Sequence, residues 1–210
     1  WHVKETLKDI PSTIHVVAAT KYFTPSEMRE LYNQGITHFG ENRVEAFLEK
    51  QSQLEDLDIK WHIIGTLQTK KAKKIINSID YLHSLDTIKL AEEINKRRTS
   101  TLKCFIQVNI SDEENKHGLE INEVIPFIQE VSKLEKIEVI GFMGMAAFVT
   151  DQESARTSFK KLHTLQKEVY DTLNLDLKEL SIGMSNDYRT AIEEKSTFLR
   201  LGSVLFDKEV

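Results

Sequence analysis

The sequence predicts an α/β protein built as one (β/α)8 barrel, and three observations indicate this class. Apolar runs recur along the whole chain of 210 residues, and amphipathic helical patterns separate them. We count eight such runs, which is typical of parallel strands joined by crossover helices. The runs are nearly continuously apolar, as expected for strands that have helices on one face and a barrel interior on the other.

The first half of the chain supplies four strand–helix units. Residues 1–12 are expected to form an N-terminal helix that packs on the barrel. The first strand is predicted at residues 14–20. Thr24 and Pro25 then mark a helix start, with Thr24 as the cap and Pro25 in the first turn, and the helix is expected to end near Gly35. Further strands are predicted at 38–40, 61–65 and 81–85, each followed by a helix, the second of these being rich in lysine.

The second half supplies the other four units. Strands are predicted at 103–108, 139–143, 179–184 and 198–202, with helices at 124–134, at 152–173 and around Ala191. Typical barrels use roughly 250 residues, so a barrel of 210 residues would be compact. An open doubly wound sheet is the alternative, but no Gly-x-Gly-x-x-Gly turn follows the first strand. We therefore expect a single domain over residues 1–210.

Composition excludes several classes of function. A net charge of -5 gives no electrostatic footprint for nucleic acid or for an anionic membrane surface. No apolar run approaches the roughly 18–20 residues that span a bilayer. The single cysteine, Cys104, excludes an internal disulfide and fits a reducing cytoplasm. No two of the seven histidines have metal-ligand spacing on one helix face, so no metal site is expected.

Candidate site residues follow from the predicted fold, because function collects at the carboxyl ends of barrel strands. Lys21 follows the first strand after seven residues without formal charge, and partial desolvation there would free its amine to attack an aldehyde. A solvated lysine at a strand end is the alternative. His83 lies at the end of the fourth strand, where it is either an acid–base group or an ordinary buried histidine.

A phosphate site is predicted after the last two strands, where barrels often bind this group. Ser185 and Asn186 are expected to open a helix whose free N–H groups favour an anion. Gly202 would let the backbone approach a phosphate closely, and Ser203 would supply a hydroxyl. Arg200 lies within the last strand and needs a partner if it is buried, either a heteroaromatic nitrogen or a carboxylate.

These residues resemble the YggS/PROSC family of pyridoxal phosphate homeostasis proteins. The match extends from about Ile14 to Phe206, and its motifs occur in the same order as in the family. The matching segments are 18–21, 39–42, 61–68, 82–86, 107–109, 116–118, 183–187 and 200–203. The resemblance implies a barrel like the N-terminal domain of alanine racemase, without the second, β-rich domain of that enzyme.

The resemblance also implies roles for particular residues. Lys21 falls on the family's Schiff-base lysine, and Arg200 on the arginine that faces the pyridine nitrogen of pyridoxal 5′-phosphate. Residues on the phosphate-binding positions are Ser185, Asn186, Gly202 and Ser203, and those on positions that line the cofactor are Asn42 and Met143. His83 belongs to one of the shared motifs, and we include it in the predicted cofactor site.

The predicted function is to buffer and deliver pyridoxal phosphate inside the cell rather than to turn over a substrate. A fixed positive charge at Arg200 disfavours protonation of the pyridine nitrogen and weakens the ring as an electron sink. We expect a monomer whose partners are pyridoxal phosphate and apoenzymes that depend on it. Two alternatives are a small amino-acid racemase, with Lys21 and His83 or Tyr22 as acid–base groups, and an aldolase whose lysine condenses directly with a carbonyl substrate.

Overall fold

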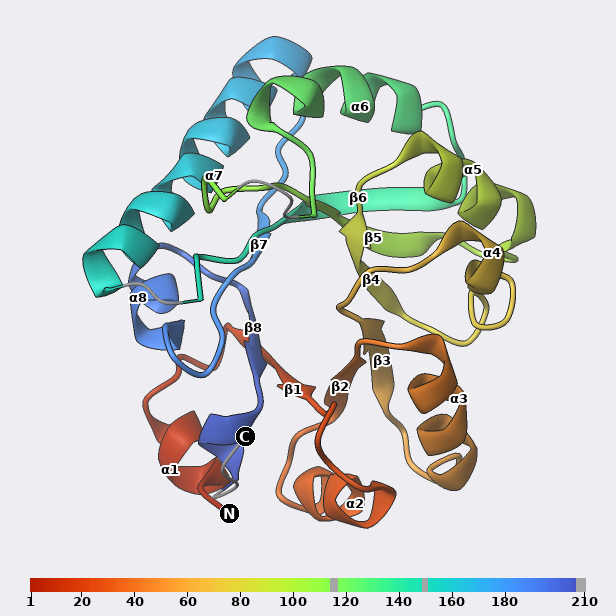
Figure 1. Ribbon diagram of the computed structural model, residues 1–210, viewed down its shortest axis with the longest axis vertical. Coiled ribbons are helices and arrows are strands. Elements are labelled where there is room, and N and C mark those ends of the chain that lie inside the picture. Colours follow the sequence, from red (N-terminus) through yellow and green to blue (C-terminus); the bar gives the residue numbers. More distant parts are fainter. Residues whose placement is uncertain (114–116, 149–150, 207–210) are drawn as a thin grey trace.

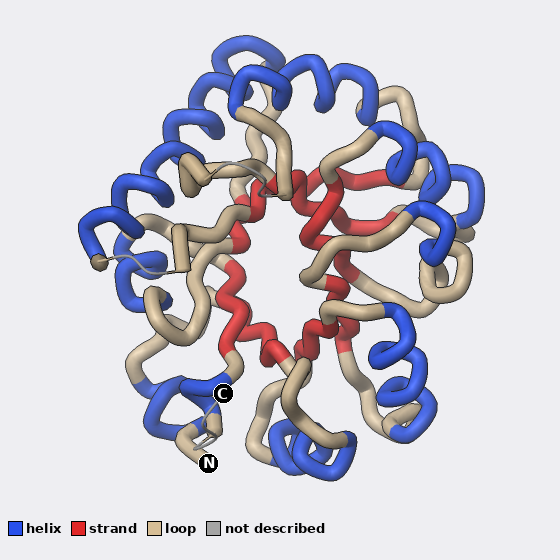
Figure 2. The backbone as a smooth tube through the Cα atoms, in the orientation of Figure 1, coloured by secondary structure: helices blue, strands red, loops and turns tan. Residues whose placement is uncertain are grey.

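Eight parallel strands pair in chain order and close into a barrel, with β8 paired back to β1. The structure is a computed structural model and describes residues 1–113, 117–148 and 151–206. Figure 2 shows the strands as an inner ring and the helices outside it. The barrel fold that the sequence predicts is therefore confirmed.

The elements alternate along the chain as labelled in Figure 1. The strands are β1 His15–Ala19, β2 His38–Glu41, β3 Lys60–Ile63, β4 Tyr81–Leu85, β5 Leu102–Gln107, β6 Ile137–Met143, β7 Glu179–Ser181 and β8 Phe198–Leu201. The helices are α1 Val3–Lys8, α2 Pro25–Asn33, α3 Val44–Gln53, α4 Thr69–Ala72, α5 Ile88–Arg97, α6 Val124–Val131, α7 Gln152–Leu173 and α8 Tyr188–Glu193. Two short 3-10 helices complete the order, η1 Ile121–Glu123 and η2 Ser203–Leu205.

Two helices show how the sequence sets these bounds. Helix α2 begins with a capping box, in which the Thr24 hydroxyl accepts from the Glu27 N–H and the Glu27 carboxylate accepts from the Thr24 N–H. Helix α7 spans the predicted range of 152–173, with Asp151 as its N-cap and Asn174 in the left-handed conformation after its last residue. The lysine-rich helix predicted after the third strand is shorter than expected, because α4 has only four residues and turns follow it.

Apolar side chains form two separate clusters. The larger one fills the layer between the strands and the surrounding helices. The smaller one lies inside the barrel and consists of Val17, Phe105, Met143 and Phe198. The interior is thus packed with side chains rather than open, and the carboxyl ends of all eight strands meet at one end of it.

Helix α1 lies beside the segment that follows β8. The His2 N–H donates to the Leu205 carbonyl over 3.0 Å, and the Thr6 hydroxyl donates to the Val204 carbonyl over 3.3 Å. Within the residues that the structure describes, no helix combines the length and apolar character that a membrane span needs. Lys116, part of the matching segment 116–118, lies outside the described residues.

Candidate functional site

Lys21 lies just beyond β1, in the turn that leads to α2. Its side chain is exposed, and its Nζ lies 5.2 Å from the centroid of the Tyr22 ring. Lys21 lies two residues beyond the last residue of β1, Ala19, and the barrel core does not enclose its side chain. The amine is therefore accessible to a ligand at the carboxyl end of the barrel.

A buried ion pair supports the backbone on which Lys21 lies. Glu41, at the end of β2, is 1% exposed, and its carboxylate accepts from Lys50 Nζ over 2.9 and 3.2 Å. The same ammonium donates to the Thr20 carbonyl over 2.7 Å, and the Thr20 hydroxyl donates to Glu41. These bonds join the end of β1, the end of β2 and α3. They hold in place the residues that follow, Lys21 after Thr20 and Asn42 after Glu41.

Two backbone N–H groups converge on one oxygen at the end of β8. The N–H groups of Gly202 and Val204 each donate to Ser185 Oγ over 3.1 Å. Gly202 also lies close to β1, because a Cβ there would be only 3.2 Å from the Ala19 carbonyl oxygen. Two N–H groups aimed at one point can bind an oxygen of a phosphate as readily as a hydroxyl.

The position of this turn differs from the prediction. Ser185 and Asn186 do not open the helix, because α8 begins at Tyr188 with Asp187 as its N-cap. Both residues instead lie in the preceding turn, which the Asp187 carboxylate closes by accepting from the Met184 N–H over 2.8 Å. Burial raises the pKa of this carboxyl. The converging N–H groups therefore belong to the segment after β8 rather than to α8.

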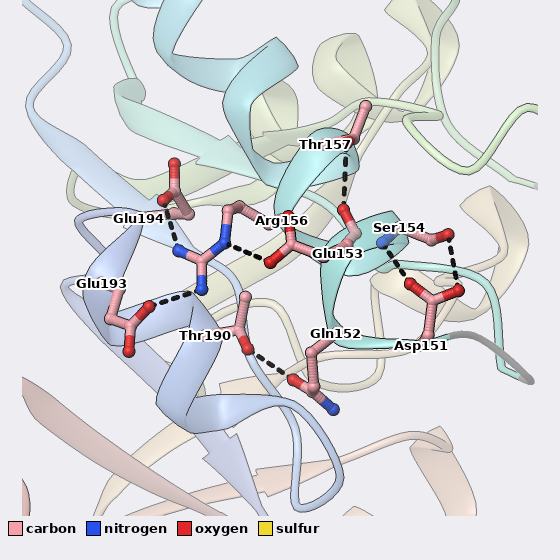
Figure 3. A network of polar contacts seen from close by, with 9 residues as sticks. All are labelled: Asp151, Gln152, Glu153, Ser154, Arg156, Thr157, Thr190, Glu193 and Glu194. Carbon is pink, nitrogen blue, oxygen red and sulfur yellow. Dashed lines mark hydrogen bonds and ion pairs between the residues drawn. The ribbon is translucent and has the colours of Figure 1, made fainter.

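A network around Arg156 holds α8 and this turn against α7 (Figure 3). The Arg156 guanidinium, on α7, contacts Glu193 at 2.6 Å and Glu194 at 3.0 Å, both at the end of α8. These carboxylates raise the pKa of Arg156. One turn earlier, Gln152 accepts from the Thr190 hydroxyl and donates to the Asn186 carbonyl over 3.2 Å. The start of α7 thereby sets the place of Asn186.

Arg200 is buried inside the barrel and is 2% exposed. Its guanidinium donates to the Ser181 carbonyl over 2.8 Å, to Ser181 Oγ over 2.5 Å and to the Gly144 carbonyl over 3.2 Å. These bonds use three of its five N–H groups and leave donors for a ligand. Burial lowers the pKa of Arg200 to about 10, while the nearby Asp187 acts in the opposite direction.

This arrangement bears on the two partners that the sequence left open for Arg200. Among the residues described, no carboxylate lies within ion-pair distance of Arg200. Its acceptors are carbonyl and hydroxyl oxygens instead. A buried cation with spare donors suits a neutral acceptor such as a heteroaromatic nitrogen.

The other predicted residues occupy three different environments. His83 is fully buried and hydrogen-bonds to His62 and Ser181. Met143 is fully buried in the small interior cluster. Asn42 is half-buried directly after β2, whereas Asn186 and Ser203 are exposed. All of them lie on or after strands at the carboxyl half of the barrel, but the hydrogen bonds join only two groups, Ser185 with Gly202 and Arg200 with His83 through Ser181.

Sequence reasoning missed two features of this region. The Glu41–Lys50 pair was hidden because Lys50 lies on α3, and only the closed barrel places its ammonium under β1 and β2. The hydrogen-bonded row of His38, His62 and His83 was hidden because the three residues are on different strands. One histidine in each of three consecutive strands is the signal that could have indicated it. No group of three or more metal-binding side chains occurs in the described part of the chain.

Known proteins share both the sequence pattern and the fold. The family described as "Alanine racemase, N-terminal domain" matches residues 14–209. The pyridoxal phosphate homeostasis protein of Aquifex aeolicus is 39% identical over 194 residues, which cover 91% of this chain and 85% of the relative. The human protein of the same name is 35% identical over 215 residues, covering 95% and 78%. PipY of Synechococcus elongatus, solved with PLP bound, superposes with a TM-score of 0.89 at 30% identity and covers 97% of each chain.

The fold and the site together define a (β/α)8-barrel protein with a lysine, a buried arginine and converging N–H groups at one end. The chain belongs to the alanine racemase N-terminal domain family and, within it, to the pyridoxal phosphate homeostasis proteins.

Proposed function

We propose that this protein binds pyridoxal phosphate, joined to Lys21 as a Schiff base, and acts in pyridoxal phosphate homeostasis as a carrier rather than as an enzyme. The observation that carries the proposal is the pair of N–H groups of Gly202 and Val204, which converge on Ser185 Oγ at the barrel end where the Lys21 amine is exposed. PipY, which shares the fold and 30% of the sequence, has been solved with the same cofactor bound.

The residues present suit the three parts of the cofactor. The N–H groups after β8, with Ser185, Asn186 and Ser203, would hold the phosphate. The Arg200 guanidinium would face the pyridine nitrogen with the donors that its bonds to Ser181 and Gly144 leave over. Asn42 and Met143 would line the ring. When bound, the cofactor would supply an aldehyde, and the Lys21 amine would condense with it and release water.

The surroundings of Lys21 favour a carrier over a racemase. A racemase needs a second acid–base group opposite its lysine. Both ring nitrogens of His83 are already hydrogen-bonded, to His62 and Ser181, and burial and the Arg200 charge hold the pKa of His83 well below its usual value. Tyr22 is 57% exposed and lies against Lys21 itself, rather than across the site from it.

The proposal extends to partners, organisation and location. Apoenzymes that depend on pyridoxal phosphate are the proposed recipients, and we propose that the chain acts as a monomer and as a single domain. A cytoplasmic location fits a chain whose one cysteine, Cys104, cannot form an internal disulfide. Cys104 is fully buried, and burial raises the pKa of its thiol.

Absorption spectroscopy of the protein loaded with pyridoxal phosphate tests the site. We expect a visible band that borohydride bleaches, and peptide mass mapping should then place a phosphopyridoxyl group on Lys21. Lys21→Ala should lose the band and the adduct yet keep weaker binding through the phosphate contacts. Lys133→Ala, a change at an exposed lysine on another part of the surface, is the matched control and should behave as the wild type.

Three outcomes would contradict the proposal. Survival of the bleachable band in Lys21→Ala would show that another lysine carries the cofactor. Steady turnover of an amino acid at ordinary enzyme rates, about 10 per second, would show that the protein is a racemase-like enzyme. Failure of the wild type to take up the cofactor at all would favour direct condensation of Lys21 with a carbonyl substrate.

A further inference from the structure

Three histidines form a continuous hydrogen-bonded row inside the barrel. His38 Nδ1 lies 2.9 Å from His62 Nε2, and His62 Nδ1 lies 2.8 Å from His83 Nε2. His83 Nδ1 lies 2.8 Å from Ser181 Oγ, which also accepts from Arg200 over 2.5 Å. The row therefore connects Arg200 with β2, β3 and β4 through Ser181.

Packing holds the imidazole rings in place on both sides of the row. His62 stacks on Tyr81 with ring centroids 4.3 Å apart and an interplanar angle of 4°, and His83 stacks on Phe105 at 4.5 Å. Neither histidine has any exposed surface, and His38 is half-buried at the amino end of the barrel. The rings cannot turn over without breaking this packing, so each nitrogen keeps its neighbour.

The direction of the hydrogen bonds follows from Arg200. A guanidinium only donates, so it occupies an acceptor position of Ser181 Oγ. Among the hydrogen bonds of the described residues, the Ser181 hydroxyl has one acceptor within reach, His83 Nδ1. His83 must then carry its proton on Nε2 and donate to His62 Nδ1, and His62 must donate from Nε2 to His38 Nδ1. All three imidazoles become neutral Nε2–H tautomers.

Burial and most of the surrounding charges also favour neutral imidazoles in this row. Burial lowers the pKa of His38, His62 and His83, and the Arg200 charge lowers that of His83 further. At the amino end, His15 and Lys60 lower the pKa of His38, while Asp80 raises it. A neutral row that ends in an N–H at His38 also presents no free ring nitrogen there to accept a proton from water.

We propose that His38, His62 and His83 are positioning residues. Their hydrogen bonds all run in one direction, and this row, which we call the relay, holds Ser181 and the guanidinium of Arg200 in place for the cofactor. The assignment of Arg200 to the cofactor rests on the proposed function, whereas the direction of the relay rests on the protein alone. Because the relay stays neutral, the charge next to the site is that of Arg200 and does not change with pH near neutrality.

Nitrogen-15 NMR of the protein without cofactor, labelled at histidine, tests the direction at pH 7.5. We expect Nε2–H tautomers at His38, His62 and His83. A charged imidazole or an Nδ1–H at His62 or His83 would overturn the proposal. His163, whose Nε2 contacts the Glu194 carbonyl outside the barrel, is the internal control and should show Nε2–H throughout. This measurement tests the direction of the hydrogen bonds in the relay even if the protein binds no cofactor.

Variants at Arg200 test what sets the direction. In Arg200→Met the guanidinium no longer turns the Ser181 hydroxyl proton toward His83, so the hydroxyl can also accept from His83, and Nδ1–H signals should appear at His83 and His62. Arg200→Lys keeps a side chain that only donates and should restore the Nε2–H pattern. Unchanged tautomers in Arg200→Met would overturn the part that we assign to Arg200.

Variants at His62 test positioning, because this residue lies three hydrogen bonds away from Arg200. His62→Phe keeps the stacking on Tyr81 but cuts the relay. We expect the dissociation constant of pyridoxal phosphate to rise roughly 3- to 10-fold, the loss of about one hydrogen bond, with a shift of the visible band. His62→Gln, which can donate and accept, should restore most of the affinity and most of the original band position. His2→Phe, at an exposed histidine outside the barrel, should change neither the dissociation constant nor the band. Equal effects of His62→Phe and His62→Gln would show a packing role only.

Discussion

Among single residues, Ser185 has two roles, as a hydrogen-bond acceptor in the free protein and as part of the proposed phosphate site. Its hydroxyl satisfies the N–H groups of Gly202 and Val204 in the free protein. Those same groups are the ones that we assign to a phosphate. Ser185 therefore acts as a stand-in acceptor, and the site keeps its shape because no buried donor is left without a partner.

A substitution at this position separates the two tasks. Ser185→Ala leaves two N–H groups without their acceptor, and we expect the free energy of unfolding of the free protein to fall by about 1–2 kcal/mol. Added inorganic phosphate should restore stability more in Ser185→Ala than in the wild type, because the anion can take both N–H groups. Urea unfolding with and without phosphate measures this, with the exposed Ser100→Ala as control. Equal stabilisation of both proteins by phosphate would show that these N–H groups do not bind the anion.

At the scale of elements, helix bounds were predictable wherever local chemistry sets them. The capping box at Thr24 and the long amphipathic pattern of α7 need no information from the rest of the chain. The strands were predictable because β1–β8 lie between the surrounding helices and the barrel interior and read as apolar runs. The start of α8 was not predictable to the residue, since Ser185, Asn186 and Asp187 are all favourable cap residues and only tertiary contacts select among them.

The strand end at which each candidate residue lies was predictable as well. Every candidate lies on or after the strand to which the sequence assigned it, because the carboxyl ends of parallel strands converge. What the sequence could not show is which side chains touch. The relay of His38, His62 and His83 depends on contacts between three strands, and the Glu41–Lys50 pair depends on how α3 packs against the end of β2.

Helix α8 depends on α7 for its place, and Arg156 tests that dependence. Arg156→Met leaves Glu194, which is 9% exposed, without its cation, so we expect unfolding free energy to fall by about 1–3 kcal/mol. Because α8 follows the Ser185 turn, affinity for pyridoxal phosphate should fall as well. Urea unfolding and a cofactor titration measure the two effects. Lys133→Met, at an exposed pair with Glu130, should stay within about 0.5 kcal/mol of the wild type. Full affinity in Arg156→Met would show that α8 does not place the turn.

At the scale of the whole molecule, the barrel interior is divided between two kinds of packing. Val17, Phe105, Met143 and Phe198 fill part of it with apolar side chains. The histidine relay fills another part with polar groups, and among the described residues no buried side-chain nitrogen or oxygen is left unpaired. Such an interior is stable only while the imidazoles stay neutral, because an added proton would put a charge in a buried, desolvated row.

This interior makes stability depend on pH in a predictable direction. Burial, and then His15, lower the pKa of His38 to about 4, and burial lowers those of His62 and His83 as well. As pH falls below about 6.5, the unfolded chain takes up protons at these residues and the folded chain does not. Their contribution is therefore fully present above pH 6.5 and is lost progressively toward pH 4.

Burial raises the pKa values of Asp86 and Asp187, and these two carboxyls act in the opposite sense as pH falls. We expect the urea midpoint to fall between pH 7.5 and pH 5, and histidine variants show which part of the fall belongs to the relay. His38→Gln should give a smaller fall, since it removes one of the three buried imidazoles. His2→Gln, at an exposed histidine outside the barrel, should leave the fall unchanged. A midpoint that stays constant from pH 7.5 to pH 5 would show that the interior tolerates charged imidazoles, and the neutral relay would then be wrong.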